Sequence, residues 1–153
     1  SAIGITAIGG NIDLEAVEIS SVEGPGIVNW GSDVDCADSS IQDAQFAGIV
    51  AQYDADLSLN GCTIEGTTPS ALGGGVGIFM DDYLYVGDTM PTALSLTDSV
   101  IRHNTLGGVY LRGPGRFSIT DNIIEGGQGL DWHERDCSRT GATSSHVLPP
   151  SFA

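Results

Sequence analysis

The sequence predicts an all-β solenoid in which the chain winds into stacked turns of short parallel strands, a parallel β-helix. The first observation is an internal repeat, in which an isoleucine recurs at intervals of 22, 23, 37 and 23 residues. The second is the abundance of glycine, which accounts for 22 of the 153 residues and is spread along the chain. A period of about 22 residues with three short β segments is typical of one β-helix turn. We expect about five to six such turns, called rungs here.

Each repeat unit contains the same segments in the same order, most completely in residues 93–113, ALSLTDSVIRHNTLGGVYLRG. An alternating triplet opens the unit, and an isoleucine lies five residues after the triplet ends. Alternation points one set of side chains into the solenoid and the next set outward. The triplets are residues 12–14, 34–36, 57–59, 94–96 and 117–119, and the isoleucines are Ile19, Ile41, Ile64, Ile101 and Ile124.

A glycine followed by an apolar residue opens the next strand of each unit. These pairs are Gly26-Ile27, Gly48-Ile49, Gly77-Ile78, Gly108-Val109 and Gly129-Leu130. We expect their apolar members to stack in one inward column. Two outward columns then read Val28, Val50, Phe79, Tyr110, Asp131 and Trp30, Gln52, Asp81, Arg112, His133. A corner column, Val17, Ser39, Cys62, Ser99, Asn122, is small or polar. We expect its polar side chains to hydrogen-bond the backbone at the bend.

The repeats divide the chain into a β-helix over residues 1–135 and a tail over residues 136–153. The one long interval has extra residues at 67–75 and 81–92, and a solenoid tolerates such insertions at its corners. The tail is rich in Ser, Thr and Pro, and we expect it to be a linker or a C-terminal cap. No amphipathic capping helix precedes the first strand, so we expect a piece of a longer protein, or capping by the tail or another subunit. A leucine-rich repeat is the alternative fold. The sequence does not contain its Leu-x-x-Leu-x-Leu-x-x-Asn motif, and no helical periodicity fills the segments between the strands.

The charge of the chain excludes several partners. There are 20 acidic residues against 5 Lys and Arg, which gives a net charge of −15. We expect no nucleic-acid binding, because phosphate requires a basic footprint, and a polyanion would be repelled unless Ca²⁺ bridged it. No apolar run approaches the ~20 residues of a membrane span, so we expect no membrane insertion.

Calcium is the one cofactor that the sequence leaves open. Carboxylates are the oxygen ligands that Ca²⁺ takes, and aspartates gather near two corners, at Asp33, Asp35 and Asp38 and at Asp54 and Asp56. Their spacing matches no complete calcium loop, so we otherwise expect no cofactor and no metal site.

The three cysteines, Cys36, Cys62 and Cys137, leave at least one unpaired within the chain. Their spacing fits no zinc or redox motif. Cys36 occupies an inward position of the repeat, where a small apolar residue is expected.

The segments LSLTDSVIRHNTLGGVYLRG and FSITDNIIEGGQGLDW resemble the right-handed parallel β-helix repeat of the pectate-lyase-like superfamily. The resemblance covers roughly residues 3–135 and implies a right-handed solenoid. It is specific for the fold rather than for a function, because the superfamily includes lyases, hydrolases, epimerases and adhesins.

Residues 129–134, GLDWHE, are similar to the Gly-Phe-Asp-Pro-His-Glu/Asp segment of mannuronan C5-epimerases. In that family the Asp and His are catalytic, which by resemblance maps onto Asp131 and His133. Trp132 replaces the proline, and the tyrosine that normally precedes the motif is absent, so that Tyr110 is only a positional substitute.

The outward columns predict one patch that could carry chemistry. Tyr110, Arg112, Asp131 and His133 would supply an acid, a base and a cation. Phe79, Asp81, Tyr83 and Tyr85 would contact the substrate, with aromatic rings stacked on sugars. The simpler alternative is structural, with an exposed salt bridge at Arg112 and surface aromatics that stabilise the sheet.

Two functions therefore stay open. We favour an extracellular or cell-surface module that binds a polysaccharide or surface glycan, or serves as a structural or adhesive domain, without catalysis. The alternative is a polysaccharide-active enzyme of the uronate lyase or C5-epimerase type, with its site on the sheet face of rungs three to five. An ice-binding solenoid would need threonine in register, which these outward columns do not show.

Overall fold

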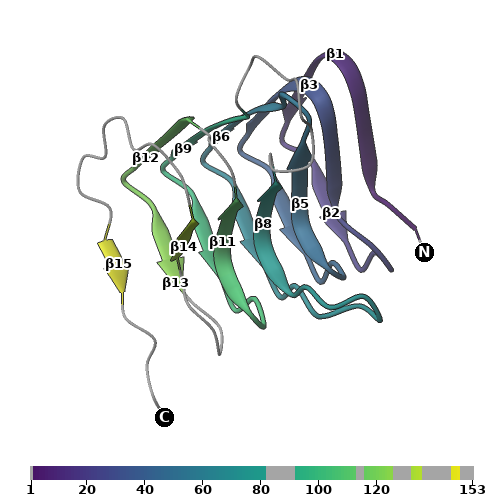
Figure 1. Cartoon of the computed structure of the whole chain (residues 1–153), viewed down its shortest axis with the longest axis vertical. Coiled ribbons are helices and arrows are strands. Elements are labelled where there is room, and N and C mark those ends of the chain that lie inside the picture. Colours follow the sequence, from purple (N-terminus) through teal and green to yellow (C-terminus); the bar gives the residue numbers. More distant parts are fainter. Residues whose placement is uncertain (1, 82–91, 113–115, 126–131, 136–145, 149–153) are drawn as a thin grey trace.

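The computed structural model describes residues 2–81, 92–112, 116–125, 132–135 and 146–148, of which the last two ranges are described as backbone only. Every named element in these ranges is a β-strand, and every strand pair is parallel. Figure 1 shows successive turns of the chain lying side by side from β1 to β15. No helix long and apolar enough to cross a membrane occurs among these residues. The predicted all-β, parallel β-helix is confirmed.

The coil has three faces, and the first two belong to one sheet because β1 and β3 run along both. The first face holds the N-terminal halves of β1 (Ile5–Glu15) and β3 (Ile27–Ala37), with β5 (Ala47–Gln52), β8 (Val76–Asp81), β11 (Gly107–Arg112) and β14 (Trp132–Arg135). The second face holds their C-terminal halves with β6 (Asp56–Asn60), β9 (Ala93–Thr97) and β12 (Arg116–Thr120). The third face holds β2 (Glu18–Ser20), β4 (Ser40–Gln42), β7 (Thr63–Glu65), β10 (Val100–Arg102), β13 (Ile123–Glu125) and β15 (His146–Leu148).

The inward columns expected from the repeat form the core. On the third face the isoleucines pair in register from Ile19 to Ile124, and each is buried. On the first face Ile27, Ile49, Ile78 and Val109 form a second buried column. Stacked like residues bury apolar area continuously along the axis, at roughly 25 cal/mol per Å².

The expected register of the last strand on the first face is wrong. Val109 pairs with Trp132, not Leu130, so His133 lies beside Tyr110 and Arg135 beside Arg112. The reason is the length of the corner, which is the same wherever it carries no insertion: the first-face residue follows the third-face isoleucine by eight positions at Ile41 and Ile49, and again at Ile124 and Trp132. A first-face strand that began at Gly129-Leu130 would break that spacing, and the corner length sets the register. The number of complete rungs stays a prediction, because residues 126–131 and 136–145 lie outside the described ranges.

Within each turn an isoleucine of the third face packs directly on a glycine that opens the first face. A Cβ atom built on any of these glycines would come closer than 3.0 Å to that isoleucine's Cγ2 atom. The contacts are Gly4 with Ile19, Gly26 with Ile41, Gly48 with Ile64, Gly77 with Ile101 and Gly108 with Ile124. The requirement is for space, since none of these glycines has a positive φ.

The corner between the second and third faces needs a left-handed backbone in every described turn. Its residues have φ between 47° and 65° and are Ala16, Asp38, Gly61, Asp98 and Asp121. Glycine adopts this region freely, and aspartate does so more readily than most other residues. Part of the high aspartate content of the chain therefore has a conformational cause.

Polar side chains at the next corner position tie consecutive turns together, as expected. The Ser39 hydroxyl accepts a hydrogen bond from the Val17 N–H at 3.0 Å, and the Ser99 hydroxyl accepts one from the Cys62 N–H at 3.1 Å. The Asn122 side-chain oxygen accepts one from the Ser99 N–H at 2.8 Å. These bonds satisfy backbone donors that the bend removes from the strand ladder.

We expect Gly48→Ala to lower the free energy of unfolding by about 1–3 kcal/mol, the usual cost of overpacking a core. The added methyl group would meet the Ile64 side chain and, at 2.7 Å, the backbone oxygen of Gly77, which cannot rotate away. Urea denaturation followed by circular dichroism measures the loss.

The double variant Gly48→Ala/Ile64→Ala serves as the control, because it removes the side chain that the new methyl group strikes. We expect the double variant to cost less than the sum of the two single variants, by about 0.5 kcal/mol or more. Strict additivity would show that the glycine is not needed for this contact.

Candidate functional site

The first face carries an aromatic ladder at the position where the sequence predicted a substrate-binding patch. Phe79 and Tyr110 point outward from adjacent strands, and their rings are parallel with centroids 5.2 Å apart. Phe46 extends the ladder, with its ring centroid 5.5 Å from that of Phe79. The ladder lies on a small apolar cluster of Val28, Ala47, Val50 and Val76. Because Phe79 and Tyr110 cover each other's ring faces, those faces are not open for stacking on a sugar.

Beside the ladder lies an ion pair between neighbouring strands. The Nη1 atom of Arg112 is 3.8 Å from the Oδ2 atom of Asp81. The Asp81 side chain is 6% exposed, whereas that of Arg112 is 43% exposed. The guanidinium therefore compensates a buried carboxylate on one side and faces solvent on the other. The structure thus brings together Phe79, Asp81, Tyr110 and Arg112, as the outward columns predicted.

The remaining residues of the predicted patch are not placed with them. Asp131, Tyr83 and Tyr85 lie outside the described residues. His133 is described as backbone only, and its strand position is beside Tyr110 rather than beside Arg112. Catalytic roles for Tyr110, Arg112, Asp131 and His133 stay a prediction.

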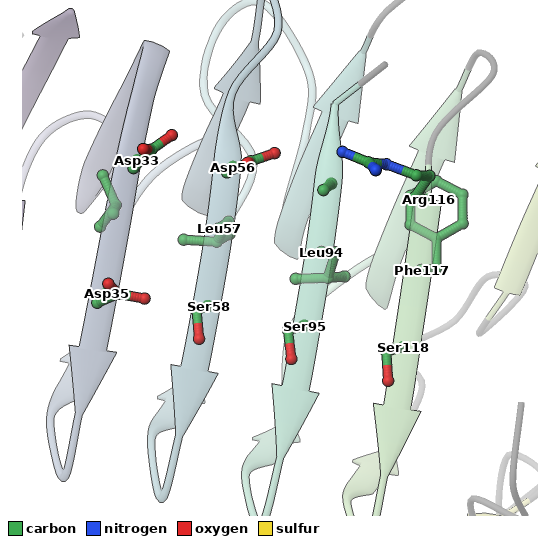
Figure 2. A pocket seen from close by; sticks show the side chains of 12 residues that line it. Asp33, Asp35, Asp56, Leu57, Ser58, Leu94, Ser95, Arg116, Phe117 and Ser118 are labelled. Atoms are coloured by element: carbon green, nitrogen blue, oxygen red, sulfur yellow. The ribbon is translucent and has the colours of Figure 1, made fainter. Parts of the chain in front are cut away.

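The second face holds a groove that the sequence reasoning did not identify. It has a volume of about 540 Å³ and crosses four neighbouring strands, β3, β6, β9 and β12. Figure 2 shows the lining side chains in rows that run across these strands. Its lining residues are Asp33, Val34, Asp35, Asp56, Leu57, Ser58, Ala93, Leu94, Ser95, Arg116, Phe117 and Ser118. The volume falls in the range of about 300–1,000 Å³ that is usual for ligand sites.

Two outward rows give the groove its polar chemistry. One row reads Asp33, Asp56, Ala93, Arg116, and the other reads Asp35, Ser58, Ser95, Ser118, each in register from strand to strand. Neighbouring positions in a row are ~4.8 Å apart, the spacing of paired strands. The first row therefore offers two carboxylates at one end and a guanidinium at the other, and the second row offers one carboxylate followed by three hydroxyl groups. Such a set can hydrogen-bond several hydroxyl groups of one extended ligand.

Arg116 is the one cation of this groove. Its side chain is exposed, and in Figure 2 it extends toward the strand that carries Leu94 and Ser95. In the described part of the chain no carboxylate lies within salt-bridge distance of it.

A sequence signal for the groove existed. The middle residue of the repeating triplet is serine in three consecutive units, at Ser58, Ser95 and Ser118. In the sequence alone these triplets mark the repeat, and Asp33, Asp35 and Asp56 are candidates for calcium ligands only. Identical outward residues in register present the same hydrogen-bonding group on each successive strand.

Across the ranges that the structure describes, no three His, Cys, Asp or Glu side chains gather so as to hold a metal ion. The aspartates of the groove are spread along its rows instead. The calcium hypothesis therefore gains no site among these residues.

A comparison with known families matches residues 1–138 to a family described as the right handed beta helix region. The match spans most of the chain and agrees with the parallel pairing of its strands. Nothing among the curated proteins or the solved structures matches the sequence.

We expect Phe79→Leu to lower the free energy of unfolding by about 1–3 kcal/mol, because Phe79 is the middle ring of the ladder and contacts both neighbours. Denaturant unfolding measures the change. Leu72→Ala is the control, since that leucine is 92% exposed and should unfold like the wild type. Unchanged stability of Phe79→Leu would show that the ladder is not a stabilising feature.

Proposed function

Because the chain belongs to the right-handed β-helix family, we propose that it is a non-catalytic module that binds an uncharged polysaccharide along the groove of its second face. The observation that carries the proposal is the pair of in-register rows across four strands, one of carboxylates and a guanidinium, the other mostly of hydroxyl groups. A polymer with repeating hydroxyl groups matches a surface with repeating acceptors and donors.

Charge supports an uncharged ligand. The net charge of −15 and the exposed carboxylates of Asp33, Asp35 and Asp56 repel a polyanion. Aspartate and arginine side chains form charge-assisted hydrogen bonds with neutral hydroxyl groups, and these bonds are stronger than neutral ones. Uncharged polysaccharide therefore fits the groove better than a uronic-acid polymer does.

An exposed aromatic pair lies at the corner that leads into the groove. The ring centroids of Trp30 and Tyr53 are 6.4 Å apart in an edge-to-face arrangement. Trp30 precedes Asp33 by three residues, and Tyr53 precedes Asp56 by three. The two side chains are 42% and 37% exposed. Rings of this kind offer an open face on which a sugar can stack.

The proposal places the module outside the cell or on its surface, where structural polysaccharides and surface glycans are found. Its partners would be such a glycan and, where the chain is part of a longer protein, further rungs or capping domains.

We expect the protein to bind at least one uncharged polysaccharide on a panel of xylan, mannan and glucan, and Arg116→Ala and Asp56→Ala each to weaken that binding about tenfold or more. Isothermal titration calorimetry with an oligosaccharide of the bound polymer gives the Kd.

Arg102→Ala is the matched control, because Arg102 lies on the third face, where its Nε atom is 2.8 Å from Glu65. Its binding should equal that of the wild type. The proposal fails if no polymer of the panel binds, or if binding survives the loss of both Asp56 and Arg116 side chains.

The alternative is catalysis on the first face, by a uronate lyase or C5-epimerase mechanism. The observation in its favour is that Tyr110 and Arg112 project outward from one strand with Asp81 next to Arg112. Arg112 would then neutralise the substrate carboxylate while Tyr110 exchanges a proton with the sugar.

Alginate and pectate test this alternative directly. We expect neither unsaturated products by ultraviolet absorbance nor a change of epimer ratio by NMR. Product that the wild type releases and Arg112→Ala does not would overturn the binding-only proposal and locate an active site on the first face.

A further inference from the structure

Two buried cysteines of successive turns touch inside the coil. Cys36 lies near the end of β3 and Cys62 at the corner between β6 and β7, and their side chains are 4% and 3% exposed. Their Sγ atoms are 3.6 Å apart, and the Cys62 Sγ atom is 3.1 Å from the Cys36 carbonyl oxygen. Both are free thiols in this structure.

The repeat supplies an internal comparison for this contact. Cys36 occupies the inward column that is otherwise Leu14, Leu59, Leu96 and Ile119. Cys62 occupies the corner column that is otherwise Val17, Ser39, Ser99 and Asn122, where serine or asparagine oxygens hydrogen-bond the backbone of the preceding turn. A thiol makes that hydrogen bond only weakly. Cys36 and Cys62 each replace a residue type that suits their column better. The two replacements contact each other.

We propose that Cys36 and Cys62 are joined by a disulfide when the chain folds in an oxidising compartment. The sulfur atoms have to approach by roughly 1.5 Å to reach a disulfide bond length. Rotation about the two Cα–Cβ bonds can supply that movement, because the thiols already face each other across one gap between turns. The inference does not depend on what the groove binds.

A low-molecular-weight disulfide such as oxidised glutathione is the oxidant. The thiolate of one cysteine attacks one sulfur of glutathione disulfide before burial, which forms a mixed disulfide and releases one glutathione thiolate. As the coil closes, the other cysteine loses its proton to solvent and attacks the sulfur of the first, which forms the Cys36–Cys62 bond and releases the second glutathione. Two cysteines are oxidised, and one glutathione disulfide is reduced to two glutathione molecules.

In the folded coil the two thiols differ in acidity. The pKa of Cys62 is lowered to about 6, chiefly by a hydrogen bond with Cys36 and in part by the backbone of Ser39 and Asn60, against the opposing effect of burial. The same hydrogen bond and burial raise the pKa of Cys36. Thiolate is the nucleophile in disulfide exchange, so Cys62 is the more reactive thiol of the pair once the coil has formed.

The bond would tie the second turn to the third inside the core. The two cysteines are 26 residues apart, about one full turn of the coil. Closing a loop of that length removes conformational freedom from the unfolded chain and stabilises the folded one. The closed core around the pair would also shield the bond from reductants.

The test is refolding from denaturant in a glutathione redox buffer, so that the oxidant reaches both thiols before they are buried. Alkylation of the remaining thiols, digestion at aspartate and mass spectrometry then give the pairing. Four aspartates lie between the cysteines, Asp38, Asp43, Asp54 and Asp56, so digestion separates the two peptides unless a disulfide links them. We expect linked peptides from the wild type and from Cys137→Ser, and a higher urea midpoint for the oxidised Cys137→Ser protein than for its reduced form.

Two control variants fix the assignment. Cys36→Ala and Cys62→Ala, each with Cys137→Ser, should show one alkylated thiol and no change of midpoint between oxidised and reduced buffer. The proposal is overturned if Cys36 and Cys62 are both fully alkylated after oxidative refolding, or if either pairs with Cys137 instead. Mapping the wild type gives this answer even where a variant does not fold.

Discussion

The contact between an isoleucine of the third face and a glycine of the first face is the constraint on which this coil depends. Wherever the structure describes both partners, the isoleucine Cγ2 atom occupies the place that a glycine Cβ would need. The carbonyl oxygen of the next turn's glycine approaches to 2.7 Å of the same place at Gly26 and Gly48. Coil closure and turn stacking in the described turns therefore rest on one missing methyl group per turn.

Because the interior is filled by stacked columns, ligand chemistry is confined to the outward residues, and the two outer faces use them differently. On the first face the outward residues satisfy one another: aromatic rings stack, and Arg112 compensates Asp81. On the second face Asp33, Asp56 and Arg116 are exposed around a groove. A surface whose groups already interact stabilises the coil, whereas one whose donors and acceptors face solvent can exchange water for a ligand.

The inward and outward columns could be predicted from the sequence because the same residue pattern recurs in every repeat unit. The inward isoleucines, the polar corner at Ser39, Ser99 and Asn122, and the outward placement of Phe79 and Tyr110 all followed from period and alternation. The expected register of the last strand was wrong because Gly129-Leu130 resembles the start of a unit, while corner length sets the register. A shift of two residues preserves the alternation of strand positions, so alternation alone does not detect it.

Period and alternation are local properties of the chain, so the fold class, the core columns and the direction of nearly every described side chain could be predicted from the amino-acid sequence. Which outward rows combine into a site depends on how the turns stack, and no local pattern predicts that. The groove joins Asp33 to Arg116, and the thiol contact joins Cys36 to Cys62, across separations that follow from how turns stack. The groove, the ring stacking and the ion pair each involve residues of different turns, so they cannot be predicted from a single repeat unit.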